Sequence, residues 1–199
     1  LDVDLVNVEV VEITNKGNAR YDFSVQTEKL EICGGNGSDT IMGGRDDDLI
    51  SGGKGADALT GGTGDDVFRF AASDSTTSRF DRLTDFKVGA DSLDFGSVQF
   101  VTDDSGVDIA AASGNKGKTI TASTVYGVIT LNGVDKAKVD SLSEWVAVAR
   151  EMVANVGEVG AFQFGGSTYV YQENDVNGDD LLVQLVGVTN VLDVSDLLV

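Results

Sequence analysis

Residues 34–69 repeat one nine-residue pattern four times without a gap. The copies read GGNGSDTIM, GGRDDDLIS, GGKGADALT and GGTGDDVFR. Positions one, two and four are glycine, position six is aspartate and position eight is a large apolar residue. The one departure is Asp46, at position four of the second copy. A fixed period of this kind predicts a solenoid in which each copy stacks on its neighbours.

Each copy divides into a six-residue turn and a three-residue strand. The glycines allow backbone conformations that a residue with a Cβ resists, and they let main-chain carbonyls point at an ion. The aspartate adds a hard carboxylate oxygen, which Ca²⁺ prefers, and Ca²⁺ accepts about six to eight oxygens. The residues at position eight are expected to face a core between two stacked sheets. They are Ile41, Ile50, Leu59 and Phe68.

The pattern G-G-x-G-x-D-x-U-x, where U is apolar, resembles the calcium-binding repeat of RTX proteins. The resemblance implies a parallel β-roll in which two copies make one full coil. Asp39 then stacks on Asp57, and Asp48 stacks on Asp66, with one Ca²⁺ between the members of each pair. The expected carbonyl ligands lie at or near Gly35, Gly37, Gly53 and Gly55 on one edge, and Gly44, Asp46, Gly62 and Gly64 on the other. Asp46 is either an added ligand or a strained turn.

Calcium is expected to be required for this segment to fold. Asp46, Asp47 and Asp48 are adjacent, Asp65 and Asp66 join them in the fold, and like charges in a small volume repel. Ordering a glycine-rich chain also costs conformational entropy. The binding free energy of Ca²⁺ then drives folding. A flexible linker is the alternative, but linkers do not keep aspartate and an apolar residue in phase through four copies.

The composition agrees with a cation-binding protein. The 199 residues include 33 acidic and 14 basic ones, so the net charge is −19. Such a surface repels nucleic acid and anionic membranes and attracts divalent cations. No run approaches the roughly 20 apolar residues of a membrane span. Cys33 is the single cysteine, so no internal disulfide forms.

The residues point away from catalysis. The chain contains no histidine, which excludes a histidine zinc motif, a serine triad and a cysteine–histidine pair from it. The aspartates fall at metal-ligand positions rather than in an apolar cleft. We interpret the chain as a non-catalytic module. Because it begins without Met, in what reads as a strand, we expect it to be the C-terminal part of a longer protein.

The sequence divides into three parts. Residues 1–33 hold short apolar runs without the calcium pattern and are predicted to be metal-free rungs of the same solenoid. Residues 34–95 are the calcium-binding roll and its closing segment. Residues 96–199 are predicted to form a β-rich cap. The predicted fold class is therefore mostly β, a parallel β-roll or β-helix solenoid followed by a cap with one α-helix.

The cap has clear local signals. Segments with strand character are 98–101, 118–122, 126–131, 161–164, 168–171 and 181–185. Gly165-Gly166-Ser167 predicts a tight hairpin turn. Ser141 and Glu144 predict a capping box for a helix whose apolar face runs from Leu142 to Val156 and which Gly157 ends.

Residues 66–95 closely resemble the C-terminal domain of serralysin-type metalloproteases. The matching residues are Asp74, Asp81, Leu83, Asp85, Phe86, Gly89, Asp91, Leu93 and Asp94. In that family, aspartates at the positions of Asp74 and Asp81 help to hold a further Ca²⁺, and the resemblance implies this role for both. Asp85 and Asp91 are interpreted instead as solvated turn residues.

Residues 168–199 are similar to the end of many type I secreted proteins. In serralysin relatives, a terminal acidic residue followed by three apolar ones belongs to an uncleaved secretion signal, here Asp196-Leu197-Leu198-Val199. The resemblance implies type I secretion machinery as a partner and an extracellular or cell-surface location. Asp175-Val176-Asn177-Gly178-Asp179 mimics part of a calcium loop but lacks a bidentate glutamate, so a plain turn is favoured.

The nature of the parent protein is open between three classes. The metal-free rungs and the cap insertion from Asp103 to Gly160 favour a bacterial surface-layer or cell-surface protein, and RTX surface-layer proteins look similar. In that case calcium also promotes lattice contacts between copies. The alternatives are an exoenzyme, such as a serralysin-like protease or an alginate epimerase, and the tail of an RTX adhesin or toxin.

Overall fold

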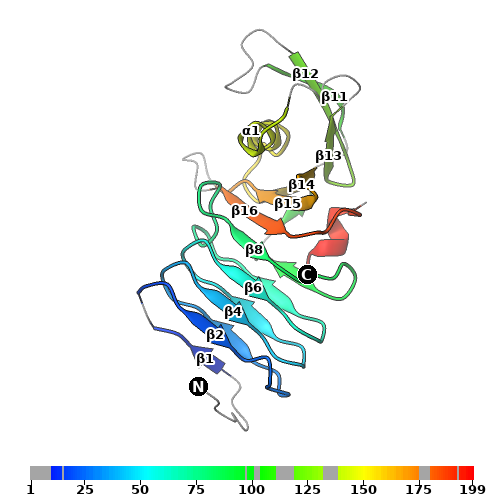
Figure 1. Cartoon of the computed structure of the whole chain (residues 1–199). Helices are drawn as coiled ribbons and strands as arrows, with labels where there is room; N and C mark the ends of the chain where they lie inside the picture. Colours follow the sequence, from blue (N-terminus) through cyan, green and yellow to red (C-terminus); the bar gives the residue numbers. More distant parts are fainter. Residues whose placement is uncertain are drawn as a thin grey trace.

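The computed structural model describes residues 10–14, 16–96, 98–100, 104–110, 119–131, 139–174, 180–191 and 193–199. They form a stack of coils that continues into a β-rich region with one helix (Figure 1). The predicted fold class, a mostly β parallel solenoid with a β-rich C-terminal region, is confirmed.

Three-residue strands build the solenoid as two parallel sheets. The first sheet contains β1 (Val10–Glu12), β3 (Glu31–Cys33), β5 (Leu49–Ser51), β7 (Val67–Arg69) and β9 (Ser92–Asp94). The second sheet contains β2 (Arg20–Asp22), β4 (Thr40–Met42), β6 (Ala58–Thr60) and β8 (Asp81–Leu83). The strands that precede the repeats belong to the same two sheets, since β1 pairs with β3 and β2 pairs with β4.

The middle residue of each strand from β3 to β7 and of β9 points into the core. Along the second sheet, Ile41 pairs with Leu59, and Leu59 pairs with Leu83 at the end of β8. These side chains are fully buried, as are those of Ile32, Ile50, Phe68 and Leu93 in the facing sheet. Each such burial contributes about 1.5–3 kcal/mol relative to exposure. Position eight of the repeat is therefore the core position, as the apolar pattern predicted.

The turns between strands lie along two edges of the solenoid. The edge formed by residues 13–14, 16–19, 34–39, 52–57 and 70–80 is called the first edge. We call second edge the one formed by residues 23–30, 43–48, 61–66 and 84–91. A joint is the contact between two successive turns on one edge.

The C-terminal region extends the second sheet of the solenoid. β16 (Leu181–Leu185) pairs in parallel with β8, and then follow β15 (Ser167–Gln172), β14 (Glu158–Phe164), β13 (Val128–Leu131), β12 (Thr119–Val125) and β11 (Asp104–Ala110). The short β10 (Gln99–Phe100) pairs with β14. Gly165 and Gly166 turn the β14–β15 hairpin with φ of 58° and 79°, which fits the predicted tight turn.

Helix α1 (Leu142–Met152) packs on β14, and the predicted Ser141–Glu144 capping box is present. The helix ends a turn before the predicted stop at Gly157, and Val156 is 58% exposed. The physical reason is Glu158, whose carboxylate accepts from the backbone N–H groups of Ala154 and Asn155 at 3.1 and 3.0 Å. Within the described residues, no helix has the length and apolar character that a membrane crossing needs.

Under the helix lies an aromatic stack. The ring of Trp145 stacks on Phe162 with centroids 5.3 Å apart, and Phe162 stacks on Tyr169 at 5.4 Å. Stacked aromatic pairs contribute about 0.5–1.5 kcal/mol beyond their buried area. Trp145 is thus a core residue that fixes α1 on the sheet.

The final residues lie along the first sheet. A 3₁₀ helix, η2 (Val194–Leu197), precedes a parallel bridge between Leu198 and Leu93, and the backbone N–H of Val199 donates to the Leu93 carbonyl at 3.2 Å. The residues predicted as a secretion signal therefore contact β9. The predicted loop Asp175–Asp179 lies outside the described residues.

Leu83 tests the continuity of roll and cap, because it pairs with both Leu59 and Leu185. Replacing Leu83 with Ala is expected to lower the free energy of unfolding by about 2–5 kcal/mol through the cavity it leaves. Arg82→Ala, at the neighbouring exposed position, is the control and is expected to stay within about 0.5 kcal/mol of the wild type. Urea unfolding in excess calcium measures the free energy of unfolding of both variants. Equal losses of this free energy in the two variants would contradict a core that the roll and the cap share.

Candidate metal centre

Asp39 and Asp57, at position six of their repeats, form a ladder along the first edge together with Asp81. The Oδ1 atom of each accepts from the backbone N–H of the corresponding residue one turn earlier. Ala19 donates to Asp39 at 2.8 Å, Asp39 to Asp57 at 2.7 Å, and Asp57 to Asp81 at 2.7 Å. The ladder holds three buried carboxylates in one row.

The second edge carries a matching ladder. Leu30 donates to Asp48 at 2.8 Å, Asp48 to Asp66 at 2.9 Å, and Asp66 to Asp91 at 3.1 Å. Ala19 and Leu30 begin the two ladders and have no carboxylate of their own. The stacking of Asp39 on Asp57 and of Asp48 on Asp66, predicted from the spacing, is therefore the arrangement that the structure has.

In most ladder aspartates, one carboxylate oxygen has no hydrogen-bond partner. Within the described residues, Oδ2 is buried and lacks a hydrogen-bond partner in Asp39, Asp57, Asp66 and Asp81. Burying a carboxylate oxygen without a donor or a cation is costly, and buried charges in proteins are paired or bind metals. These four oxygens indicate positions where a cation is needed.

Glycine makes room for these carboxylates. A Cβ on Gly52 would collide with the carboxylate of Asp57, and a Cβ on Gly55 would collide with the Gly37 carbonyl oxygen of the turn below. The turns therefore stack with carbonyl and carboxylate oxygens crowded together, which is the ligand type that Ca²⁺ prefers.

Asp46 fills a glycine position without strain. Among the corresponding glycines, Gly37 and Gly64 have φ of 127° and 125°, whereas neither Gly55 nor Asp46 is among the described residues with positive φ. Its exposed carboxylate accepts from the backbone N–H of Asp47 at 3.0 Å. The strained-turn interpretation of Asp46 is therefore wrong.

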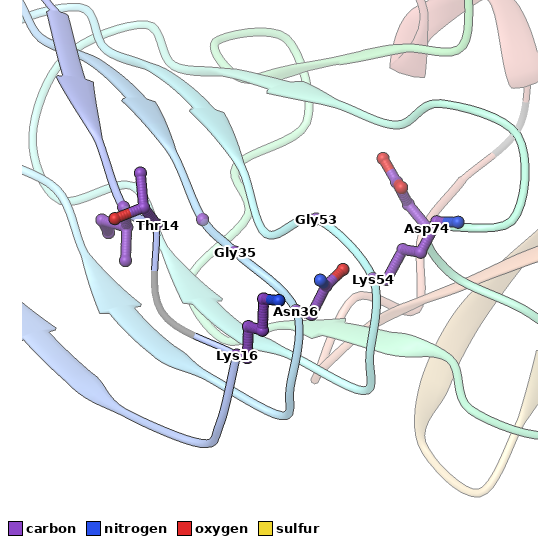
Figure 2. Close-up of a pocket in the computed structure, with 9 residues that line it drawn as sticks. Thr14, Lys16, Gly35, Asn36, Gly53, Lys54 and Asp74 are labelled. Atoms are coloured by element: carbon purple, nitrogen blue, oxygen red, sulfur yellow. The ribbon is translucent and has the colours of Figure 1, made fainter.

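The carbonyls predicted as ligands lie in the joints, where some already accept hydrogen bonds. Gly35 accepts from the N–H of Lys54 at 3.1 Å, and Gly44 accepts from that of Thr63 at 3.3 Å. Gly35, Gly53 and Asp74 help to line a depression of about 330 Å³ on the first edge (Figure 2). The structure thus places the predicted residues of each edge in one stack of turns.

Asp74 and Asp81 come together near Asp57. Asp81 is the next member of the ladder after Asp57, although the longer turn sets them 24 residues apart. The Asp74 carbonyl accepts from the N–H of Gly55 at 3.2 Å, and its carboxylate accepts from that of Ala71 at 2.9 Å. The Asp74 carboxylate helps to raise the pKa of both Asp57 and Asp81.

The interpretation of Asp91 as a solvated turn residue is wrong. Asp91 is 2% exposed and closes the second-edge ladder. Asp85 is half-buried and accepts from the N–H groups of both Gly61 and Gly62 at 2.9 Å. Sequence reasoning missed both residues because the last turn is longer than the repeat, so the eighteen-residue spacing no longer applies to it.

Burial makes the ladder carboxyls hard to ionise without a cation. Burial, and next the nearby carboxylates, raises the pKa of Asp57 and of Asp66 to about 6 from an ordinary 3.8. The same causes raise the pKa of Asp81 to about 9. Hydrogen bonds from the backbone N–H groups of Asp39, Asp48 and Asp57 oppose these shifts without cancelling them.

The side chains alone do not complete a metal site. Nowhere in the described part of the chain do three acidic or cysteine side chains converge as a metal-binding group. Since Ca²⁺ accepts about six to eight oxygens, backbone carbonyls of two adjacent turns must supply most of the ligands. The glycine-lined joints offer such carbonyls beside the unpartnered carboxylate oxygens.

Residues 34–68 match the family model of the RTX calcium-binding nonapeptide repeat, in four copies. This segment is a run of RTX calcium-binding repeats. The turns of these RTX repeats contain four of the six ladder aspartates, while Asp81 and Asp91 follow them in the chain. The ligand that the family model implies agrees with the buried unpartnered oxygens.

Comparison with solved structures found subunits of a mannuronan C5-epimerase from Azotobacter vinelandii. The AlgE6R3 subunit is 20% identical with a TM-score of 0.49, over 98% of this chain and 81% of that one. The AlgE6R2 subunit is 19% identical with a TM-score of 0.42, over 90% and 84%. No curated protein matched the sequence.

The raised pKa values predict how the metal-free RTX segment responds to pH. A raised pKa means that the folded state favours the protonated form of Asp57, Asp66 and Asp81. Their contribution to the stability of the folded state is therefore fully present below about pH 4. It is lost as pH rises through about 6 and then about 9. In chelator, the fraction of folded protein should therefore be higher at about pH 5 than at about pH 8.

Excess calcium should reverse this order, because protons compete with Ca²⁺ for the same oxygens. Far-UV circular dichroism measures the folded fraction in both conditions. A chelated protein that is more stable at about pH 8 would contradict the assignment.

Proposed function

We propose that this chain is a calcium-dependent folding module in which Ca²⁺ links the stacked turns of the RTX repeats. The observation that carries the proposal is the set of four ladder carboxylate oxygens that are buried without a partner. A bound Ca²⁺ supplies the positive charge that these oxygens need. Without it, the carboxylates of each ladder repel one another within a glycine-rich chain that gains little from folding.

The proposed calcium ligands come from the two turns that meet at each joint. On the first edge, one Ca²⁺ binds between the turns of Asp39 and Asp57, with carbonyls at or near Gly35, Gly37, Gly53 and Gly55. A further Ca²⁺ binds at Asp74 and Asp81, beside Asp57. On the second edge, Asp48 and Asp66 bind an ion together with carbonyls at or near Gly44, Asp46, Gly62 and Gly64. The unpartnered Oδ2 atoms of Asp57 and Asp81 support the first-edge sites.

The chain's residues then act as scaffold rather than as catalyst. The aspartates with raised pKa values are held by backbone amides within the stacked turns. There they bind and orient an ion that links two coils. This arrangement supports a non-catalytic role, in which calcium and folding are one event.

The cellular role we propose is folding after export. Free calcium is scarce inside cells and abundant outside, so the acidic segment stays unfolded until it leaves the cell. Asp196 to Val199 act as the secretion signal for type I machinery; the exposed side chain of Val199 and the surface position of Asp196 support this. The location that follows is extracellular.

For the parent protein we propose a surface-layer or cell-surface protein. The strands before the calcium repeats, which lengthen the solenoid, support it, and calcium bound between copies would offset the repulsion that a net charge of −19 sets up between them. In calcium, the purified protein should then form ordered two-dimensional arrays by electron microscopy. Dispersed monomers in calcium would favour the alternatives, a module of a serralysin-like or epimerase-like exoenzyme or an adhesin tail.

A calcium titration followed by far-UV circular dichroism tests the folding role. The wild type should lose its strand signal in chelator and regain it in calcium. Asp57→Asn removes one charged ligand and should raise the calcium concentration at half-folding at least about tenfold, which corresponds to about 1.4 kcal/mol.

Asp65→Asn is the matched control, since Asp65 is exposed in the same repeat segment and the charge change is identical. Its calcium midpoint should stay within about twofold of the wild type. An unchanged strand signal after complete calcium removal would sink the proposal, as would equal shifts in the two variants.

A further inference from the structure

The joints between RTX turns share a common hydrogen bond. The carbonyl at position two of one turn accepts from the backbone N–H at position three of the next turn. Gly35 accepts from Lys54 in this way on the first edge, and Gly44 accepts from Thr63 on the second. The carbonyl at position two is also one of the predicted calcium ligands.

The last joint of the second edge, between turns 61–66 and 84–91, is built differently. Here the carbonyl at position two is that of Gly62, and it accepts from the side-chain ammonium of Lys87 at 2.8 Å. A positively charged group of the protein thus contacts a carbonyl oxygen of the kind that binds calcium elsewhere in the roll.

Each carboxylate oxygen of Asp85 and Asp91, in turn 84–91, accepts a backbone hydrogen bond. Asp85 accepts from Gly61 and Gly62 through its two oxygens, both at 2.9 Å. Asp91 accepts from Asp66 through Oδ1 at 3.1 Å and from the backbone N–H of Lys87 through Oδ2 at 2.8 Å. Neither aspartate of this turn therefore has an unpartnered carboxylate oxygen of the kind found at Asp57, Asp66 and Asp81.

The last joint of the first edge shows the contrast. Asp81 occupies the position on that edge that Asp91 occupies on the second, but its Oδ2 atom is buried without a partner. The nearby Asp74 adds a second negative charge at this joint. The first edge thus ends in a carboxylate oxygen without a partner. On the second edge, the last joint has backbone amide donors and the ammonium group of Lys87 instead.

We propose that Lys87 is a built-in cation that closes the last joint of the second edge in place of calcium. An ammonium is a compact charge with three donors, so it can bind the Gly62 carbonyl and lie close to acidic neighbours. The calcium sites of the second edge then end at turn 61–66, while those of the first edge continue to Asp81. The inference rests on the proposed calcium-dependent fold.

The sign of one mutational effect separates this role from general electrostatics. Removing a positive charge near a cation site should tighten calcium binding, because the lost charge repelled the ion. If Lys87 closes the joint, its removal should instead weaken the folded state and raise the calcium concentration needed for folding.

The test compares Lys87→Gln with Arg45→Gln, which removes the same charge from an exposed side chain on the same edge. Calcium midpoints come from circular dichroism, and urea midpoints are measured in saturating calcium. Lys87→Gln should raise the calcium midpoint at least about threefold, and its urea midpoint should stay below that of Arg45→Gln. Arg45→Gln should leave the calcium midpoint unchanged or lower it.

Lys87→Arg keeps the charge and should stay within about twofold of the wild-type calcium midpoint. If Lys87→Gln does not fold at all, folding of Lys87→Arg still supports the proposal, and failure of both with a folded Arg45→Gln overturns it. A calcium midpoint of Lys87→Gln at or below that of the wild type also overturns it. So does full recovery in excess calcium with one additional ion bound by calorimetry.

Failure of the underlying calcium role is a separate result. A wild type that folds equally well in chelator would refute the calcium-dependent fold. The urea midpoints of Lys87→Gln and Arg45→Gln would still differ if Lys87 closes the joint, and equal midpoints would refute its role.

Discussion

The hydrogen bond from a backbone amide to the aspartate one turn later is the interaction on which the solenoid depends. It places each carboxylate under the preceding turn, fixes the vertical register and fills one carboxylate oxygen. In four of the six ladder aspartates, the second oxygen is then buried without a partner. The same contact that orders the stack therefore creates its need for a cation, so architecture and ligand are inseparable.

The two edges satisfy this need to different degrees. On the first edge, three successive aspartates keep an unpartnered oxygen, whereas on the second edge Asp48 is satisfied by the Gly44 amide at 2.6 Å and Asp91 by the Lys87 amide. Hydrogen bonds within turns 43–48 and 84–91 thus supply partners to the type of carboxylate oxygen that is left unpartnered on the first edge.

Strict periodicity explains what the sequence could predict. Position six and position eight of the repeat predicted the ladder and the core, because an invariant spacing converts directly into stacking. Asp91 and the end of α1 could not be predicted in the same way. Asp91 depends on a turn whose length departs from the repeat, and the helix end depends on Glu158, whose carboxylate accepts from the amides of two residues that follow the helix.

The pairing of β8 with β16 brings together segments about one hundred residues apart in the chain, such as Asp81 and Val183. A long connection joins these two strands, whereas short turns join successive coils, so the β8–β16 pairing carries the larger loop-closure entropy cost. The C-terminal region thereby presents a sheet edge on which β8 and the coils before it stack.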